Sequence, residues 1–225
     1  MAPNLLRLHD VRRTYHGGAQ AVPALRGITL RVEEGEFVAL TGPSGSGKTT
    51  LLNILGLLDR PDGGEYLFMG TAAMHLPERR RALVRGSAIG FVFQAFNLLA
   101  ERTALENVEL GLRYRRLPAD RRREEATAAL ARVGLGERLH HRPRELSGGE
   151  QQRTAIARAI VGGRRLLLCD EPTGNLDSAS AHQVLELLTS LNEQGTTVVL
   201  VTHNEEMAHY ARRIVALKDG SLVTE

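Results

Sequence analysis

The chain contains the sequence GPSGSGKT at residues 42–49, directly after the continuously apolar residues 37–40 and at the start of the helix-like residues 49–58. Glycines let the backbone curl so that successive N–H groups point inward, and the dipole of the following helix adds positive potential. A strand, a loop of this composition and a helix in that order predict a phosphate-binding P-loop. Ligands in such folds bind at the carboxyl ends of parallel strands, so the remaining sequence must supply a parallel sheet.

Apolar patterning along the rest of the chain predicts that sheet. Residues 28–32 alternate between apolar and polar, which is typical of a half-exposed strand in an N-terminal antiparallel layer. Between residues 95 and 150 the pattern is helical, with a stop at Gly134, and an apolar stripe over 184–191 predicts another helix that ends at Gly195. Further strands are expected at 89–93, 166–169, 198–202 and 214–217. Strands alternating with helices predict a largely parallel sheet covered on both faces.

Composition limits the class of protein. Hydrophobic residues make up 42% of the 225 residues and charged residues 24%, which is ordinary for a globular protein. The longest apolar segment, 51–58, is too short to cross a bilayer, and residues 1–13 lack the features of a signal peptide. The single cysteine, Cys169, excludes an internal disulfide framework and agrees with a reducing compartment. We therefore expect a cytoplasmic location.

Arginines cluster at three places along the chain, although the net charge is only +3. A nucleic-acid-binding surface is usually more strongly basic and offers more aromatic side chains for base stacking, so no nucleic-acid partner is expected. We interpret the clusters as solvated helix faces, with contact to anionic lipid headgroups as a second interpretation. The clusters lie at 79–81, 115–116 and 121–123.

Within the P-loop, Lys48 is placed to bridge the β- and γ-phosphates of a nucleotide, and the Thr49 hydroxyl to ligate Mg²⁺. Pro43 has no N–H group, so the donors must come from the residues after it. An accidental strand-to-helix turn is the alternative, but Lys48 is one of only two lysines in the chain, the other being Lys218. The expected phosphate-contacting residues are Gly42, Ser44, Gly45, Ser46, Gly47, Lys48, Thr49 and Thr50.

Two adjacent carboxylates, Asp170 and Glu171, directly follow the apolar residues 166–169. In a P-loop enzyme the first carboxylate usually holds Mg²⁺, commonly through water, and a second one next to it can polarise the attacking water. Alone, an acidic pair after a strand is more often a helix cap or a turn, but the P-loop favours the catalytic interpretation. Cys169 is interpreted as a core residue.

A second glycine-rich helix start lies at residues 146–153, with the sequence LSGGEQQR. Ser147 and Glu150 have the spacing of a capping box, which any helix can use. The two glycines between them exceed that need and expose further backbone donors at a helix N-terminus. The chain is therefore expected to have two anion-binding helix starts. One nucleotide has only a single polyphosphate to offer to them.

The residues 146–153 resemble the signature peptide of the ATP-binding cassette (ABC) superfamily, and the other landmarks of that superfamily follow in order. Gln94 lies 46 positions after Lys48 (94 − 48) and resembles the Q-loop glutamine, and residues 174–177 resemble the D-loop. His203, 33 positions after Asp170 (203 − 170), resembles the H-loop histidine, and Tyr15 the aromatic residue that stacks on adenine. Judged singly, Tyr15, Gln94 and His203 would each be ordinary structural residues.

The resemblance implies the following roles. Catalytic functions are expected for Lys48, Gln94, Glu171 and His203. Contacts to Mg²⁺ are expected from Thr49, Gln94 and Asp170. Beyond the P-loop, contacts to ATP are expected from Tyr15, Ser147, Gly148, Gly149 and Gln151. Two copies of the chain would pack head to tail, and each ATP would lie between the P-loop of one copy and the signature peptide of the other.

The fold implied by the resemblance is a single α/β domain over residues 1–225. It would have a P-loop NTPase core (1–94 and 154–225) with a mostly parallel sheet, an N-terminal antiparallel β layer, and an inserted helical subdomain at about 95–153. Residues 52–59 and 90–99 are similar to the branch of lipoprotein-releasing and macrolide- or peptide-exporting ATPases. We therefore expect a separately encoded transmembrane permease as partner and a peripheral position on the inner face of the cell membrane.

Other classes remain open from the sequence. An ABC ATPase that regulates a cell-envelope or cell-division complex without transport would share every catalytic residue. Soluble ABC proteins of DNA repair or translation usually carry two cassettes or a long coiled-coil insertion, and this chain has neither. A nucleoside or shikimate-type kinase would explain the P-loop but not the signature peptide.

Overall fold

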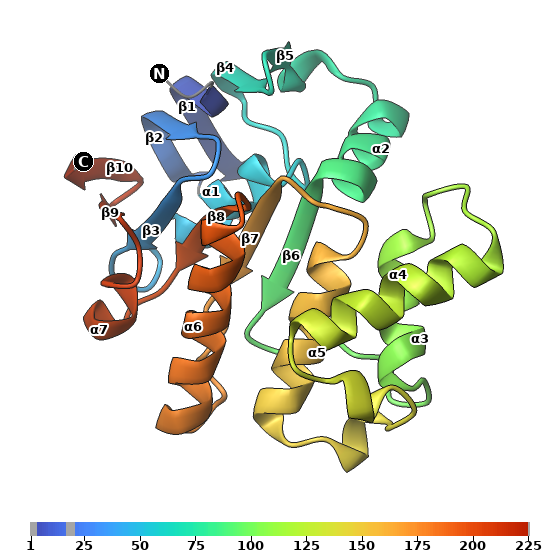
Figure 1. Cartoon of the computed structure of the whole chain (residues 1–225). Helices are drawn as coiled ribbons and strands as arrows, with labels where there is room; N and C mark the ends of the chain where they lie inside the picture. Colours follow the sequence, from blue (N-terminus) through green and yellow to red (C-terminus); the bar gives the residue numbers. More distant parts are fainter. Residues whose placement is uncertain (1–3, 17–20, 225) are drawn as a thin grey trace.

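Four strands of the computed structural model, which describes residues 4–16 and 21–224, form an antiparallel sheet in the order β2-β1-β4-β5 (Figure 1). The residues of β2 that alternate in the sequence also alternate in burial, with Ile28, Leu30 and Val32 inside. This sheet is the predicted N-terminal antiparallel layer. Its strands are β1 (Asn4–His16), β2 (Ala21–Glu33), β4 (Gly63–Phe68) and β5 (Thr71–Ala72).

The larger sheet has six strands in the order β10-β9-β3-β8-β7-β6. Five of them are parallel, and only β10 runs antiparallel to its neighbour. The five strand segments expected from their apolar sequences are all present, within one residue at each end. The strands are β3 (Phe37–Thr41), β6 (Ile89–Phe93), β7 (Leu166–Asp170), β8 (Thr197–Val201), β9 (Arg213–Lys218) and β10 (Ser221–Thr224).

The two faces of the larger sheet belong to two separate hydrophobic clusters, because alternate strand residues point to opposite faces. One face packs with the antiparallel sheet and helix α1 (Lys48–Leu55). The opposite face is covered by α5 (Gly148–Ile160) and α6 (Ser178–Glu193), and α3 (Ala104–Glu109) and α4 (Ala119–Arg132) pack on α5. The central strands β3, β7 and β8 are thus buried on both sides, which explains their almost continuously apolar sequences.

The remaining helices are short or peripheral. Helix α2 (Glu78–Ala88) precedes β6, and α7 (Glu205–Ala208) precedes β9. The part of the chain that the structure describes also contains four 3₁₀ turns: η1 (Ala73–His75), η2 (Leu110–Leu112), η3 (Gly136–Arg138) and η4 (Pro143–Glu145). Figure 1 shows α3, α4 and α5 grouped beyond β6, on the opposite side of the molecule from β9 and β10.

The helix expected over residues 49–58 is shorter than predicted, because α1 ends at Leu55. Leu57 adopts a left-handed conformation with a φ of 57°, and its carbonyl accepts hydrogen bonds from the guanidinium groups of Arg81 and Arg85. Gly56 packs so closely that a Cβ atom there would lie 2.2 Å from Cζ of Phe91. Contacts with α2 and β6 therefore end a helix that the apolar sequence would allow to continue.

The interpretation of residues 79–81 as a solvated helix face is wrong for Arg81. Its side chain is buried, and it donates to the carbonyl oxygens of Leu57 and Asp59 at 2.7 Å each. Burial lowers the pKa of Arg81 despite the neighbouring carboxylate of Glu78. Arg81 thus holds the turn that follows α1.

Over residues 4–16 and 21–224, no helix has the length and apolar character needed to span a membrane.

Candidate functional site

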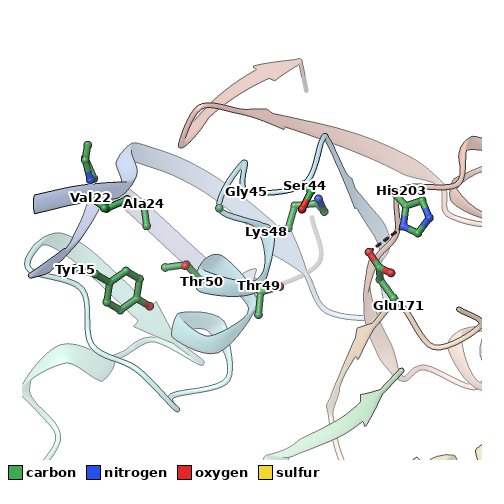
Figure 2. A pocket seen from close by; sticks show the side chains of 12 residues that line it. Tyr15, Val22, Ala24, Ser44, Gly45, Lys48, Thr49, Thr50, Glu171 and His203 are labelled. Atoms are coloured by element: carbon green, nitrogen blue, oxygen red, sulfur yellow. Dashed lines mark hydrogen bonds and ion pairs between the residues drawn. The ribbon is translucent and has the colours of Figure 1, made fainter. Parts of the chain in front are cut away.

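A pocket of about 650 Å³ lies at the carboxyl end of the parallel strands, where the P-loop follows β3. Figure 2 shows Tyr15 at one end of this pocket, Glu171 and His203 at the other, and the P-loop between them. The structure therefore brings together residues that are far apart in the sequence. The lining residues are Tyr15, Val22, Pro23, Ala24, Ser44, Gly45, Gly47, Lys48, Thr49, Thr50, Glu171 and His203.

The glycines of the P-loop have conformations that the loop requires. Gly42 and Gly47 have φ angles of 142° and 104°, which L-residues with side chains rarely adopt. A Cβ atom at Gly42 would lie 2.1 Å from the carbonyl oxygen of Leu217, and one at Gly47 would lie 2.5 Å from that of Ala24. Gly47 is also the N-cap residue of α1 and provides no side-chain cap. The first N–H groups of α1 are left without a side-chain acceptor, as an anion-binding helix start requires.

The ammonium group of Lys48 is buried at the floor of the P-loop, with only 7% of the residue exposed. It donates hydrogen bonds to the carbonyl oxygens of Gly42 (2.8 Å) and Pro43 (2.9 Å). These bonds fold the Lys48 side chain back along the P-loop, where it forms part of the pocket lining. A polyphosphate entering the pocket would compete with two backbone carbonyls for this cation.

Asp170 is the last residue of β7, next to Lys48 and Thr49 in space. Burial and the negative charge of Glu171 raise the pKa of Asp170, and the opposing effects of Lys48 and Thr49 are smaller. A carboxylate whose charge is disfavoured in the free protein gains most from a nearby cation. The position therefore suits a residue that meets a metal ion.

Glu171 and His203 contact each other at the far end of the pocket. Nδ1 of His203 lies 2.9 Å from Oε1 of Glu171, and because an ionised carboxylate only accepts, the ring nitrogen is the donor. Glu171 has a left-handed backbone with a φ of 46°, held by its N–H bond to the carbonyl of Val201 at 2.9 Å. Such a conformation costs free energy in a residue with a side chain and is frequent at functional sites.

Gln94 does not line this pocket. Its Nε2 atom donates to Oδ1 of Asn175 at 3.3 Å, and Nδ2 of Asn175 donates to the carbonyl of Gln94 at 3.1 Å. A neighbouring cavity of about 270 Å³ joins Gln94 to Glu171, His203 and the residues after β7. Gln94 is thus beside the carboxylate end of the site, and its predicted contact to Mg²⁺ stays a prediction.

The ring of Tyr15 is fixed on one side of the pocket. Its hydroxyl donates to Oδ2 of Asp59 at 2.8 Å, and the guanidinium carbon of Arg13 lies 4.7 Å from the ring centroid. Arg13 is itself paired with Asp59 and Asp62. The tyrosine is 39% exposed, so its other face is open to a planar ligand.

The signature peptide lies outside the pocket. Ser147, Gly148, Gly149 and Gln151 are all at the start of α5 and none of them contributes to its lining. The capping box is formed as expected: Oγ of Ser147 accepts from the Glu150 N–H (3.3 Å), and Oε2 of Glu150 accepts from the Ser147 N–H (2.8 Å). Arg138 pairs with the same carboxylate at 3.3 Å. The two glycine-rich helix starts therefore lie apart in the single chain.

One wall of the pocket, at residues 22–24, was not found from the sequence. These residues belong to β2 and carry no polar side chain that would mark a binding site. Their place is set by tertiary structure, because the carbonyl of Ala24 lies against Gly47. The missing side chain of Gly47 is the only local signal for this contact.

Comparison with known proteins identifies the family. The sequence family described as ABC transporter matches residues 25–174. The chain belongs to the ABC transporter family. An uncharacterized ABC transporter ATP-binding protein of Thermotoga maritima is 51% identical over 97% of this cassette and 93% of its own length. The predicted family and its ATP-binding cassette are thereby confirmed.

Macrolide export ATP-binding/permease proteins also match, as the predicted branch implies. MacB of Brucella melitensis is 50% identical to the cassette over 98% of this chain and 34% of its own length. The cassette thus spans about a third of the length of these curated relatives.

Solved structures confirm the ABC ATPase fold and its α/β class. The ATP-binding cassette MJ0796, solved as a dimer in a post-hydrolysis state bound to ADP and Pi, has a TM-score of 0.88 at 43% identity. The match covers 97% of each chain. CbiO1 of Clostridium perfringens, part of the transporter complex cbiONQ, also has a TM-score of 0.88, at 27% identity and with coverage of 98% and 87%. The cassette is an ABC ATPase domain.

Proposed function

We propose that the cassette hydrolyses ATP and that two copies pair head to tail around two nucleotides to drive a membrane partner. The adenine would stack on the open face of Tyr15, and the phosphates would meet the N–H groups at the start of α1. Lys48 would exchange its bonds to two carbonyls for bonds to the β- and γ-phosphates.

The hydrolytic step would occur at the carboxylate end of the pocket. Glu171 would accept a hydrogen bond from the attacking water and draw its proton away as the new bond to the γ-phosphorus forms. His203, which now donates to Glu171, would hold that carboxylate in place and contact the γ-phosphate. The bond between the γ-phosphorus and the bridging oxygen would break, giving ADP and phosphate. These groups act by position and charge on a dispersed negative transition state.

The residues around Asp170 fit a magnesium ion bound together with the nucleotide. Over residues 4–16 and 21–224, no group of three or more histidine, cysteine or acidic side chains is placed to hold a metal ion. Mg²⁺ commonly uses one or two protein oxygens and completes its shell with phosphate and water oxygens. Thr49 and Asp170, with Gln94 nearby, would supply the protein oxygens, and the ion would neutralise charge on the β- and γ-phosphates.

The separation of the two helix starts carries the proposal of a head-to-tail pair. Residues 147–149 do not reach the P-loop pocket of their own chain, and a second copy would bring its own signature peptide to the open side of the nucleotide. Ser147 would then release at least part of its cap when its hydroxyl and N–H groups meet the γ-phosphate.

The Glu171→Gln variant tests hydrolysis and pairing together. We expect hydrolysis to fall about 10²–10³-fold or more, since the group that polarises the water is removed. ATP should still bind and hold a stable dimer, measured by light scattering with Mg-ATP at high protein concentration. A variant that stays monomeric under these conditions would contradict the pairing.

We further propose that residues 1–94 and 154–225 act as the core and residues of about 95–153 as a helical subdomain that transmits the closing motion. Helix α5 runs across residue 153, so the two parts would share this helix rather than a flexible linker. The partner would be a separately encoded transmembrane permease of the macrolide-export or lipoprotein-release kind, with the cassette on the inner face of the membrane.

Purification from gently solubilised host membranes tests the partner. The Glu171→Gln chain, trapped with ATP, should recover a permease in a fixed ratio. Recovery of cell-division or wall-hydrolase factors would instead favour the regulatory ABC ATPases. Recovery only with ribosomes or DNA would exclude the transporter while leaving the ATPase intact.

A further inference from the structure

The signature helix α5 contains one fully buried polar side chain whose hydrogen bonds end beside two predicted catalytic residues. This side chain is Gln152, with 0% of the residue exposed. Its Nε2 group donates to the carbonyl oxygen of Phe93 at 3.2 Å and to that of Pro172 at 2.5 Å. Phe93 immediately precedes Gln94, and Pro172 immediately follows Glu171.

The orientation of the Gln152 amide follows from its surroundings. Both neighbouring backbone groups are carbonyls, so only the NH₂ end can face them, because the reverse orientation would place three oxygens together. The outward Oε1 has no hydrogen-bonding partner in the described part of the chain. A buried amide in this arrangement gives its donors to the two carbonyls and gains no protein contact for its acceptor within the described residues.

The two bonds join helix α5 to the end of β6 and to the segment that follows β7. Phe93 ends β6 and is paired in register with Asp170, the last residue of β7. Gln152 therefore links the end of β6 and the segment just after β7 to a helix whose N-cap residue, Ser147, lies five positions earlier. Along an α-helix this separation is only about 7.5 Å, so a displacement of the helix start is passed directly to the amide.

A second side chain of the same helix binds the chain just beyond Gln94. Arg158 donates to the carbonyl oxygens of Phe96 (2.9 Å) and Asn97 (2.6 Å). Helix α5 thus contacts the segment around Gln94 on both sides, at residue 93 through Gln152 and at residues 96–97 through Arg158. Of the two, only Gln152 also contacts the segment that carries Glu171.

We infer that Gln152 is a positioning residue for ATP hydrolysis, which fixes Gln94 and Glu171 relative to the signature helix. This inference rests on the proposed function, because it assigns Gln152 a part in the same hydrolytic step. Gln152 does not touch the nucleotide; it acts through the backbone on either side of the reacting groups. A shift of one ångström at such groups lowers rates strongly, so loss of the amide should lower kcat and leave the binding of ATP unchanged.

The chain offers a matched control in Asn192. It is also buried, and its amide likewise donates to two backbone carbonyls, those of Gly35 and Thr196, at 2.9 Å each. These carbonyls precede β3 and β8, at the amino end of the sheet and away from the pocket. Asn192→Leu and Gln152→Met each leave two buried carbonyls without their amide donor, so both should lower the melting temperature.

The test first measures the melting temperature of the wild-type chain and of both variants. It then measures kcat and KM for ATP at a temperature well below all three melting temperatures. For Gln152→Met we expect kcat to fall about ten- to hundredfold with little change in KM. Asn192→Leu should keep kcat within about twofold despite its lower melting temperature. If Gln152→Met does not fold, Gln152→Leu, which likewise removes the amide donors without adding an oxygen, replaces it.

Two results would overturn the inference: a Gln152 variant with unchanged kcat, or equal losses of kcat in the two variants. In both cases an active wild type would leave the proposed function standing. A wild-type chain without ATPase activity would overturn the proposed function and this inference together, so the two failures are distinguishable.

Discussion

The starts of α1 and α5 are both rich in glycine and both predicted to meet phosphate, yet they are built differently. At α1 the N-cap residue is Gly47, which has a left-handed φ of 104° and no side chain with which to cap the helix. At α5 the N-cap residue is Ser147, and a complete capping box with Glu150 occupies the helix start. Arg138 further holds the carboxylate of that box.

The difference concerns what each site needs before it can bind an anion. The start of α1 leaves its N–H groups without a side-chain acceptor and has a buried cation, Lys48, beside it. The start of α5 already contains an anion, the carboxylate of Glu150, whose pKa is lowered by the hydrogen bond from the Ser147 N–H. At the first site a phosphate would displace only the two carbonyl bonds of Lys48, whereas at the second it would compete with the carboxylate of the capping box. We therefore expect α1 to dominate nucleotide binding and α5 to act only after pairing.

The largest effect should come from Lys48→Ala. Loss of the only cation at the P-loop should lower hydrolysis about 10²–10³-fold, as for removal of a single transition-state donor, and should weaken ATP binding. Lys218, the other lysine, is exposed on β9, and Lys218→Ala is the control. Fluorescent nucleotide titration and phosphate release measure both quantities. Unchanged ATP affinity in Lys48→Ala would contradict the expectation that the start of α1 dominates nucleotide binding.

Asp170→Asn should abolish hydrolysis almost as fully and yet stabilise the nucleotide-free protein. The pKa of Asp170 is raised in the fold by burial and by Glu171, so folding favours its neutral form. Stability from this group is complete below the unfolded pKa of about 3.9 and is lost as the pH rises through the folded pKa. The asparagine variant should therefore melt higher than the wild type at pH 7, and the difference should vanish below about pH 4.

Melting curves between pH 4 and pH 8, recorded without nucleotide, measure this effect. A variant that melts lower than the wild type at pH 7 would show that the carboxylate of Asp170 stabilises the free fold. The fold would then not disfavour the charged form of Asp170, contrary to the raised direction of its pKa.

The P-loop was predictable because its glycines are required by the conformation of the loop. Gly42 and Gly47 have backbone angles and close contacts that exclude a Cβ atom, so their chemistry can be read locally. The central strands of the parallel core were predictable for a similar reason: β3, β7 and β8 are buried on both faces and are almost wholly apolar. The capping box of Ser147 and Glu150 was also predictable, since its two bonds span only three residues.

Features set by distant contacts were not predictable in this way. Helix α2 has a polar sequence with a single buried residue, Arg81, and so no apolar stripe marks it. The end of α1 depends on arginines at least 24 positions later, which bind the carbonyl of Leu57. Gln152 was visible in the signature peptide, but its role depends on carbonyls 59 and 20 positions away. No local pattern predicts such partners.

Ser147→Ala tests whether the capped helix start has a second role. Loss of the cap should cost about 1 kcal/mol, or a melting temperature lower by about 2–4 °C for a chain of this size. If Ser147 also meets the γ-phosphate of the paired copy, hydrolysis should fall about tenfold or more, while ATP binding by the single chain stays unchanged.

Thr103→Ala is the matched control, because Thr103 and Glu106 form the same capping box at α3. Its melting temperature should fall by a similar amount with no loss of hydrolysis. Equal losses of hydrolysis in the two variants would mean that Ser147 only caps α5. The start of α5 would then not be a second phosphate site.

The smallest effect should be that of Glu150→Gln, which keeps the shape of the capping box and removes its charge. The lowered pKa of Glu150 means that its contribution to stability is present above the unfolded pKa and is lost as the pH falls through the folded pKa. The wild type should exceed the variant by about half a kcal/mol of unfolding free energy at pH 7, a typical value for an anion at a helix start. Urea denaturation should show this difference shrinking below about pH 4.3, the ordinary value for glutamate. A variant of equal stability at pH 7 would mean that the carboxylate does not compete for the start of α5, and that both helix starts are open to phosphate in the single chain.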